Sequence, residues 1–239
     1  MIESKAQKAL WPWGTGTPAT VFAMLAVGLL CAIVPLSYAL YGTFALPVLV
    51  FLGVAAISMH GLRYSYPHDV LGACNAVTLG RAAVVAMRAG AILNPAPAWA
   101  IFSIATIAFA LDGLDGWLAR RAGLSSGFGA RFDMEVDALL GAVLALVILM
   151  RGTVGAEILV LGFARYVFVL AALIWPALQG NLPDSFRRKA GCVVQISALI
   201  MLLFPLTPPW LLTPVTLVGA AVLLYSFAVD AIYLMRQKP

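Results

Sequence analysis

A long run without a charged residue constrains the fold of this chain more than any other feature. Between Lys8 and Arg63 the sequence contains no Asp, Glu, Lys or Arg. About 20 consecutive apolar residues suffice to cross a bilayer, whereas the apolar region of a cleaved signal peptide has about 7–15. The run therefore predicts permanent membrane-spanning helices rather than a signal peptide.

Similar apolar stretches recur along the rest of the chain. The sequence is 63% hydrophobic and 10% charged, whereas soluble proteins have about 25% charged residues. We expect an interfacial segment at residues 61–74 and loops at residues 121–128 and 179–189. The fold class predicted is all-α, a polytopic membrane protein with eight transmembrane helices at residues 18–41, 44–60, 75–93, 98–120, 129–150, 154–178, 190–206 and 210–235.

The distribution of basic residues predicts which side of the membrane each loop faces. Lys and Arg accumulate in the cytoplasmic loops of membrane proteins. With both termini in the cytoplasm, only Arg88 and Arg151 fall on the opposite side, while Arg81 and Arg165 lie within spans. Eleven basic residues are then cytoplasmic: Lys5, Lys8, Arg63, Arg120, Arg121, Arg131, Arg187, Arg188, Lys189, Arg236 and Lys238. This bias toward cytoplasmic Lys and Arg explains the net charge of +5. The sequence has no basic stripe interleaved with aromatic residues, so we expect no nucleic-acid partner.

Four aspartates stand at the predicted cytoplasmic ends of two consecutive spans. Asp112 and Asp115 are three residues apart, and Asp133 and Asp137 are four apart, so each pair shares a helix face. The short linker predicts antiparallel neighbouring helices, which would bring the carboxylates together. Converging carboxylates repel one another in a low-dielectric site, and either protonation or bound cations must relieve this repulsion. Hard oxygen ligands suit Mg²⁺, Mn²⁺ or Ca²⁺, and two such ions form a clamp for displacement at phosphorus.

Small residues and one arginine accompany the aspartates. Gly116 follows Asp115 on the same predicted helix, where glycine costs about 1 kcal/mol relative to alanine, and a closely approaching ligand would explain it. Gly129 and Ala119 are placed to admit a ligand in the same way, and Arg120 supplies a cation for a phosphate. The alternative is that Asp112 and Asp115 only cap the end of a span and pair with Arg120 and Arg121.

The complete spacing resembles the signature of the CDP-alcohol phosphotransferase (CDP-alcohol phosphatidyltransferase) family, D-x-x-D-G-x-x-A-R, eight residues, then G-x-x-x-D-x-x-x-D. The resemblance covers about residues 72–235 and implies a six-helix core. We therefore expect two parts, 1–71 with two extra transmembrane helices and an interfacial loop, and 72–239 with the core. Every fixed position is filled, by Asp112, Asp115, Gly116, Ala119, Arg120, Gly129, Asp133 and Asp137.

The resemblance implies a role for each of these residues. Asp112, Asp115 and Asp133 would bind two Mg²⁺ or Mn²⁺ ions. Asp137 would complete the metal site and act as the general base toward the acceptor hydroxyl. Arg120 would contact the diphosphate of a CDP-activated donor, whose β-phosphorus the acceptor oxygen attacks while CMP leaves. The cytidine would lie against the small residues, Gly116, Ala119 and Gly129.

A polar stripe opens the third predicted span. Asn75, Thr78 and Arg81 recur at helical spacing in an otherwise apolar segment. Alone, the stripe is also compatible with an interfacial helix start and a snorkelling arginine. Beside the signature, it resembles the nucleotide-facing side of the family's first core helix. We therefore predict that these three residues bind the nucleotide.

Basic residues elsewhere predict an anionic acceptor. Arg165 is expected inside the sixth span, where an arginine needs a partner or a water-filled cavity. Arg187, Arg188 and Lys189 precede the seventh span, where the general bias toward cytoplasmic basic residues is the alternative explanation. We predict that Arg165, with residues of this cluster, binds an anionic group of the acceptor.

These features together predict an integral-membrane enzyme of phospholipid synthesis. It would transfer a phosphatidyl group from CDP-diacylglycerol to the hydroxyl of a polar alcohol, such as glycerol 3-phosphate, and release CMP. Alternatives are a CDP-choline or CDP-ethanolamine enzyme with diacylglycerol as acceptor, an ion-coupled transporter, and a structural membrane protein. A transporter needs carboxylates near the bilayer midplane, whereas these stand at the ends of spans. We expect a homodimer in a bacterial inner membrane, with both termini and the active site cytoplasmic.

Overall fold

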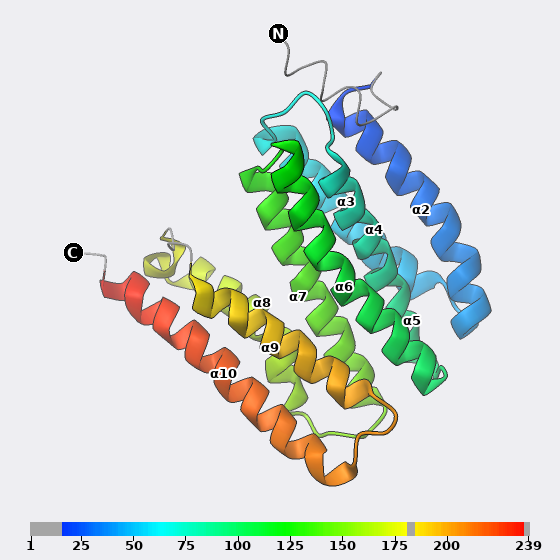
Figure 1. Cartoon of the computed structure of the whole chain (residues 1–239), viewed down its shortest axis with the longest axis vertical. Helices are drawn as coiled ribbons and strands as arrows, with labels where there is room; N and C mark the ends of the chain where they lie inside the picture. The colour runs from blue at the N-terminus through cyan, green and yellow to red at the C-terminus, as the bar shows by residue number, and fades with distance from the viewer. Residues whose placement is uncertain (1–15, 181–184, 237–239) are drawn as a thin grey trace. The chain divides into compact units, whose positions relative to one another are not determined.

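The computed structural model describes residues 16–180 and 185–236, without the side chains of residues 114–117, 119 and 120 (Figure 1). The described part is entirely helical, which confirms the all-α prediction. It consists of α2 (Pro18–Tyr41), α3 (Ala45–Ser65), α4 (Ala73–Arg88), α5 (Gly90–Leu93), α6 (Ala98–Ala122), α7 (Gly127–Met150), α8 (Ile158–Ile174), the 3-10 helix η1 (Pro176–Gln179), α9 (Phe186–Leu203) and α10 (Pro209–Arg236).

Within the described residues, four helical segments are long and apolar enough to cross a membrane. They are α2, α3, α10 and the segment Ala73–Leu93, which joins α4 and α5. Apolar stretches in α6 and α8 are shorter. Each of the eight predicted spans therefore corresponds to helical structure, while the number that cross the membrane stays a prediction.

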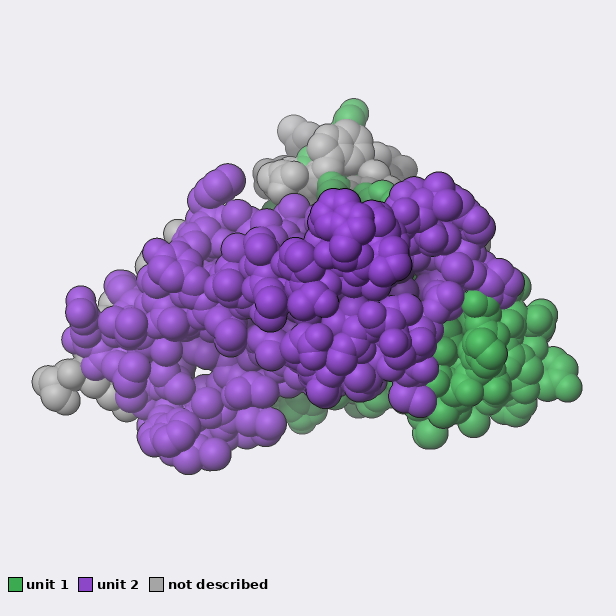
Figure 2. Space-filling model, turned by 90° about the horizontal axis from the view of Figure 1, so that it is seen from below, with its two compact units in different colours: residues 1–96, 103–136 green, residues 97–102, 137–239 purple. Residues whose placement is uncertain are grey.

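The chain divides into two compact units (Figure 2). The first contains residues 1–96 and 103–136, and the second residues 97–102 and 137–239, so that the division falls within α6 and again within α7. In the first unit, α2 and α3 pack against each other and both pack against α4. In the second unit, α10 packs against α8 and α9. The two N-terminal helices thus cover α4, the helix that carries the polar stripe.

The helix of the second predicted span, residues 44–60, extends further than expected, while the interfacial position of residues 61–74 stays a prediction. α3 continues as a helix to Ser65. It ends where Tyr66 adopts an extended conformation, with φ −87° and ψ 121°. The residue before a proline disfavours the helical region, and Pro67 follows Tyr66. A proline, rather than a loss of hydrophobicity, therefore ends this helix.

The sixth predicted span, residues 154–178, is shorter than expected. α8 covers 17 residues, which at 1.5 Å per residue is about 26 Å, against about 30 Å for a bilayer core. Trp175 leaves the helix in an extended conformation, with φ −111° and ψ 96°, and Pro176 opens η1. The proline again decides the boundary.

The prediction of a loop through residue 189 was also wrong, since α9 begins at Phe186. Arg187, Arg188 and Lys189 therefore form its first turn. Cations at a helix N-terminus oppose the helix dipole at a cost of roughly 0.3–1 kcal/mol each. Their position calls for a compensating partner or ligand.

The third predicted span divides into α4 and α5 where it meets the end of α2. A Cβ atom at Gly90 would lie 2.5 Å from Cδ2 of Tyr41, so only glycine permits this approach. Arg88, predicted to lie on the side opposite the cytoplasm, is fully buried within the fold, and its Nη1 donates to Tyr41 Oη at 3.0 Å. Asn94 Nδ2 donates to the Tyr41 carbonyl at 2.8 Å. These hydrogen bonds join the end of α2 to α4 and to the residue that follows α5.

Candidate active site

Arg81 joins three helices of the first unit. Its side chain is only 1% exposed. Nη2 lies 3.0 Å from Asp112 Oδ1 on α6, and Nη1 donates to Asp133 Oδ1 on α7 at 2.6 Å. Arg81 itself is on α4, so it links the polar stripe to the aspartate signature. Because its guanidinium is buried, Arg81 does not snorkel to an interface.

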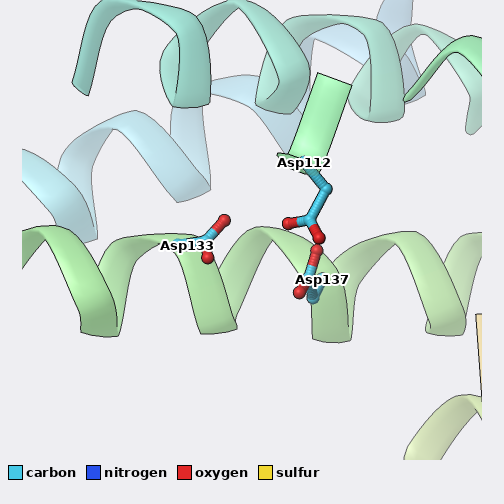
Figure 3. Close-up of side chains that lie close together, drawn as sticks. All are labelled: Asp112, Asp133 and Asp137. Carbon is cyan, nitrogen blue, oxygen red and sulfur yellow. The ribbon is translucent and has the colours of Figure 1, made fainter. Parts of the chain in front are cut away.

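Asp137 adds a third carboxylate to this group. It follows Asp133 by one turn of α7, and although the second unit begins at Asp137, the helix is continuous across the division. Figure 3 shows Asp112 pointing from α6 toward the two aspartates of α7. One carboxylate oxygen from each of the three lies within 4.8 Å of the others, and all three residues are half-buried.

The charge and chemistry of this group suit a divalent cation. These four described side chains, three carboxylates and the guanidinium of Arg81, together carry two formal negative charges. Carboxylate oxygens are the ligands that Mg²⁺ and Mn²⁺ prefer. Half-burial leaves the oxygens within reach of an ion while weakening the solvent screening of their repulsion. Asp112, Asp133 and Asp137 therefore fit the predicted metal site.

The structure does not describe the side chains of four signature residues that follow Asp112. Asp115, Gly116, Ala119 and Arg120 stand on α6, where the backbone is helical. Their predicted contacts with metal and nucleotide stay predictions.

Gly129 brings the signature against the polar stripe at a second point. A Cβ atom at Gly129 would lie 3.3 Å from Asn75 Oδ1 and 3.2 Å from Ser126 Oγ. The Gly129 N–H donates to Ser126 Oγ at 3.0 Å, at the start of α7. A side chain at position 129 would therefore crowd the amide oxygen of Asn75.

All three residues of the polar stripe are buried in the first unit. Asn75, Thr78 and Arg81 share the inner face of α4, and the Thr78 hydroxyl donates to the Cys74 carbonyl at 3.0 Å. Asn75 and Arg81 contact α7, at Gly129 and Asp133 respectively. The stripe is thus buried, and through Arg81 it contacts the aspartates.

The sequence analysis did not identify Tyr66, which anchors Asn75. Tyr66 Oη donates to the Val70 carbonyl at 3.0 Å and accepts from Gly72 N at 3.4 Å and from Asn75 Nδ2 at 3.1 Å. Burial raises the pKa of Tyr66 to about 12. The sequence feature that could have identified Tyr66 is its position before a proline and close to the start of the polar stripe.

The predicted acceptor residue Arg187 is engaged within the second unit. Its Nη1 donates to the Ser226 carbonyl and to Ser226 Oγ, the latter at 3.0 Å. Its Nη2 forms an ion pair with Oδ1 of Asp230, which is 6% exposed. This pairing compensates one of the cations in the first turn of α9.

Asp230 was also missed by the sequence analysis. It lies in α10, a helix apolar enough to span a membrane. A carboxylate within such an apolar stretch is the sequence feature that could have identified Asp230. The other predicted acceptor residues differ in environment: Arg165 on α8 and Arg188 on α9 are half-buried, and Lys189 is exposed. The three basic residues at the start of α9 therefore differ: Arg187 pairs with Asp230, Arg188 is half-buried and Lys189 is exposed.

The sequence of this chain is similar to those of known proteins. Two proteins of Mycobacterium tuberculosis, from strains CDC 1551 / Oshkosh and ATCC 25618 / H37Rv, are each named "Probable phosphatidylglycerophosphate synthase". Each is 32% identical to this chain over 127 residues, which are 53% of this chain and 59% of the relative. No solved structure matches the chain significantly. The family model for CDP-alcohol phosphatidyltransferase matches residues 71–229, which include the polar stripe and the whole aspartate signature, and the chain belongs to this family.

Proposed function

We propose that this protein transfers a phosphatidyl group from CDP-diacylglycerol to the hydroxyl of a polar alcohol and releases CMP. The observation that carries the proposal is the group of Asp112, Asp133 and Asp137 around Arg81, in a chain of this family. The match spans 59% of each of the two mycobacterial relatives, whose names favour glycerol 3-phosphate as the acceptor.

The donor half of the site is assigned to the signature and the polar stripe. Asp112, Asp115, Asp133 and Asp137 would hold two Mg²⁺ or Mn²⁺ ions, which when bound stabilise negative charge on the transferred phosphate. Arg81 holds two of these carboxylates in position from α4. The nucleotide-binding residues are Asn75, Thr78, Arg81, Gly116, Ala119, Arg120 and Gly129.

The reaction replaces a phosphoanhydride bond by a phosphoester bond. The acceptor oxygen forms a bond to the β-phosphorus, and the bond from that phosphorus to the oxygen of CMP breaks. The proton of the acceptor hydroxyl passes to a carboxylate oxygen of Asp137, which acts as the general base. Arg165, with Arg187, Arg188 and Lys189, would bind the anionic group of the acceptor.

The same proposal places the enzyme in the inner membrane of a bacterium as a homodimer. The apolar helices support a membrane location, and the basic residues support cytoplasmic termini and a cytoplasmic active site. We propose residues 72–239 as the catalytic core and residues 1–71 as an added segment. The packing of α2 and α3 against α4 suggests that this segment supports the helix carrying the polar stripe.

Membranes containing the protein are expected to release CMP from CDP-diacylglycerol when the acceptor is supplied. A panel with glycerol 3-phosphate, serine, inositol and inositol phosphate should identify the acceptor by the phospholipid formed. EDTA is expected to stop the reaction, and added Mg²⁺ or Mn²⁺ to restore it, because the carboxylates need their cations. A parallel assay supplies CDP-choline or CDP-ethanolamine with diacylglycerol. Turnover only in that assay would favour the alternative enzyme, and no turnover in either, or turnover unaffected by EDTA, would contradict the proposal.

Replacing Arg165 with alanine is expected to raise the KM for an anionic acceptor by about ten- to a hundred-fold, the effect of losing a charge-assisted hydrogen bond. The KM for CDP-diacylglycerol should change much less, and steady-state kinetics with each substrate varied in turn measures both. Arg63→Ala, at an exposed position on α3 with no assigned role in binding, is the control for losing one positive charge. Equal increases in both KM values would remove Arg165 from the acceptor pocket.

A further inference from the structure

We propose that Tyr66 is a positioning residue that fixes the Asn75 amide for recognition of the cytosine base. The inference rests on the proposed function, in which the cytidine nucleotide lies against Asn75 and Gly129. It concerns residues of the first unit only. Tyr66 would not touch the substrate, and its effect would pass through Asn75.

The hydrogen bonds of the Tyr66 hydroxyl decide which end of the Asn75 amide faces it. A tyrosine hydroxyl has one hydrogen to donate and two lone pairs to accept with. The hydrogen goes to the Val70 carbonyl, which can only accept, and one lone pair takes the Gly72 N–H. The remaining lone pair requires a donor. Asn75 can supply one only from Nδ2, which lies 3.1 Å away.

The Tyr66 ring is held in place independently of its hydroxyl. It makes edge contacts with His68 and with Phe128, at centroid distances of 5.3 Å and 5.6 Å. Phe128 also lies against Gly61, where an added Cβ would be 3.3 Å from its ring. A phenylalanine at position 66 can keep these contacts, so Tyr66→Phe removes the hydroxyl alone.

Because Nδ2 of Asn75 donates to Tyr66 Oη, the Oδ1 atom of the same amide points away from Tyr66. The oxygen lies toward Gly129, 3.3 Å from the point that a Cβ would occupy there. A ligand resting on Gly129 therefore meets an acceptor and not a donor. Cytosine carries an exocyclic amino group that can donate to this oxygen, whereas uracil carries a carbonyl at the same position and would face oxygen with oxygen.

The inference is tested by comparing CMP and UMP binding to the full-length protein in detergent, using isothermal titration calorimetry. The unaltered protein is expected to prefer CMP. Tyr66→Phe should lower the ratio of UMP Kd to CMP Kd by about ten-fold, because the freed amide can turn over and accept either base. Tyr64→Phe makes the same chemical change at an exposed position two residues away and should leave the ratio unchanged.

A second variant separates positioning from a general effect on folding. Asn75→Ala should lower the ratio at least as far as Tyr66→Phe, and the double variant should match Asn75→Ala alone, because Tyr66 acts through Asn75. A lower melting temperature in Tyr66→Phe with an unchanged ratio would show a merely structural tyrosine and overturn the inference. Absence of CMP binding by the unaltered protein would contradict the proposed function itself, and this inference with it. CMP binding without preference over UMP would overturn the inference alone.

Discussion

Replacing Asp137 with asparagine is expected to slow CMP release by at least about a hundred-fold while leaving CMP binding in place. Asparagine keeps the size of the side chain but cannot take the proton of the acceptor hydroxyl. A positioned general base contributes roughly 10²–10⁴-fold to a rate. Steady-state CMP release measures the loss of turnover, and calorimetric titration with CMP measures binding.

The neighbouring carboxylate provides the control for the Asp137 variant. Glu135 lies two residues earlier on α7, outside the group of three aspartates, and is also half-buried. Glu135→Gln is expected to retain most of the activity. Because Asp137 is also placed to hold a metal ion, the assay should be repeated at increasing Mg²⁺. Recovery of turnover at high Mg²⁺ would show that Asp137 acts as a ligand and not as the base.

Removing Arg187 alone is expected to lower the free energy of unfolding by about 3–5 kcal/mol, the usual effect of breaking a buried ion pair. Arg187→Ala leaves Asp230 without its counter-ion at a position that is only 6% exposed. It also removes the two hydrogen bonds to Ser226 that join α9 to α10. Because Arg187 is 27% exposed and partly solvated, the lower end of this range is expected. Reversible denaturation in detergent measures the change.

A double replacement distinguishes the ion pair from a role in substrate binding. Arg187→Met combined with Asp230→Leu replaces the pair by apolar side chains and should recover most of the stability. Lys189→Ala, in the same helical turn but exposed, should cost little. No greater loss for Arg187→Ala than for Lys189→Ala would contradict the structural role. If the stable double variant has a normal KM for the acceptor, Arg187 does not bind the acceptor.

Much of the fold was predictable because helix formation in this chain follows local sequence. Hydrophobic stretches of suitable length located helices corresponding to all eight predicted spans, and α2 agrees with its prediction at both ends. The errors lie where a helix boundary depends on something other than hydropathy. Pro67 and Pro176 end helices through the residue that precedes each. The close approach of Tyr41 explains why residue 90 must be glycine.

The sequence by itself determined that the chain is helical, that it belongs with membrane proteins, and that aspartates on consecutive helices would meet. These conclusions follow from composition and from spacing along single helices. Only the tertiary structure decided the partners of the charged side chains. Arg81 was predicted as a nucleotide contact, but its observed partners include Asp133, 52 residues away, and Arg187 pairs with Asp230, 43 residues away. Such partners are set by how helices pack, because a buried charge must be neutralised by whatever group the neighbouring helix brings within reach.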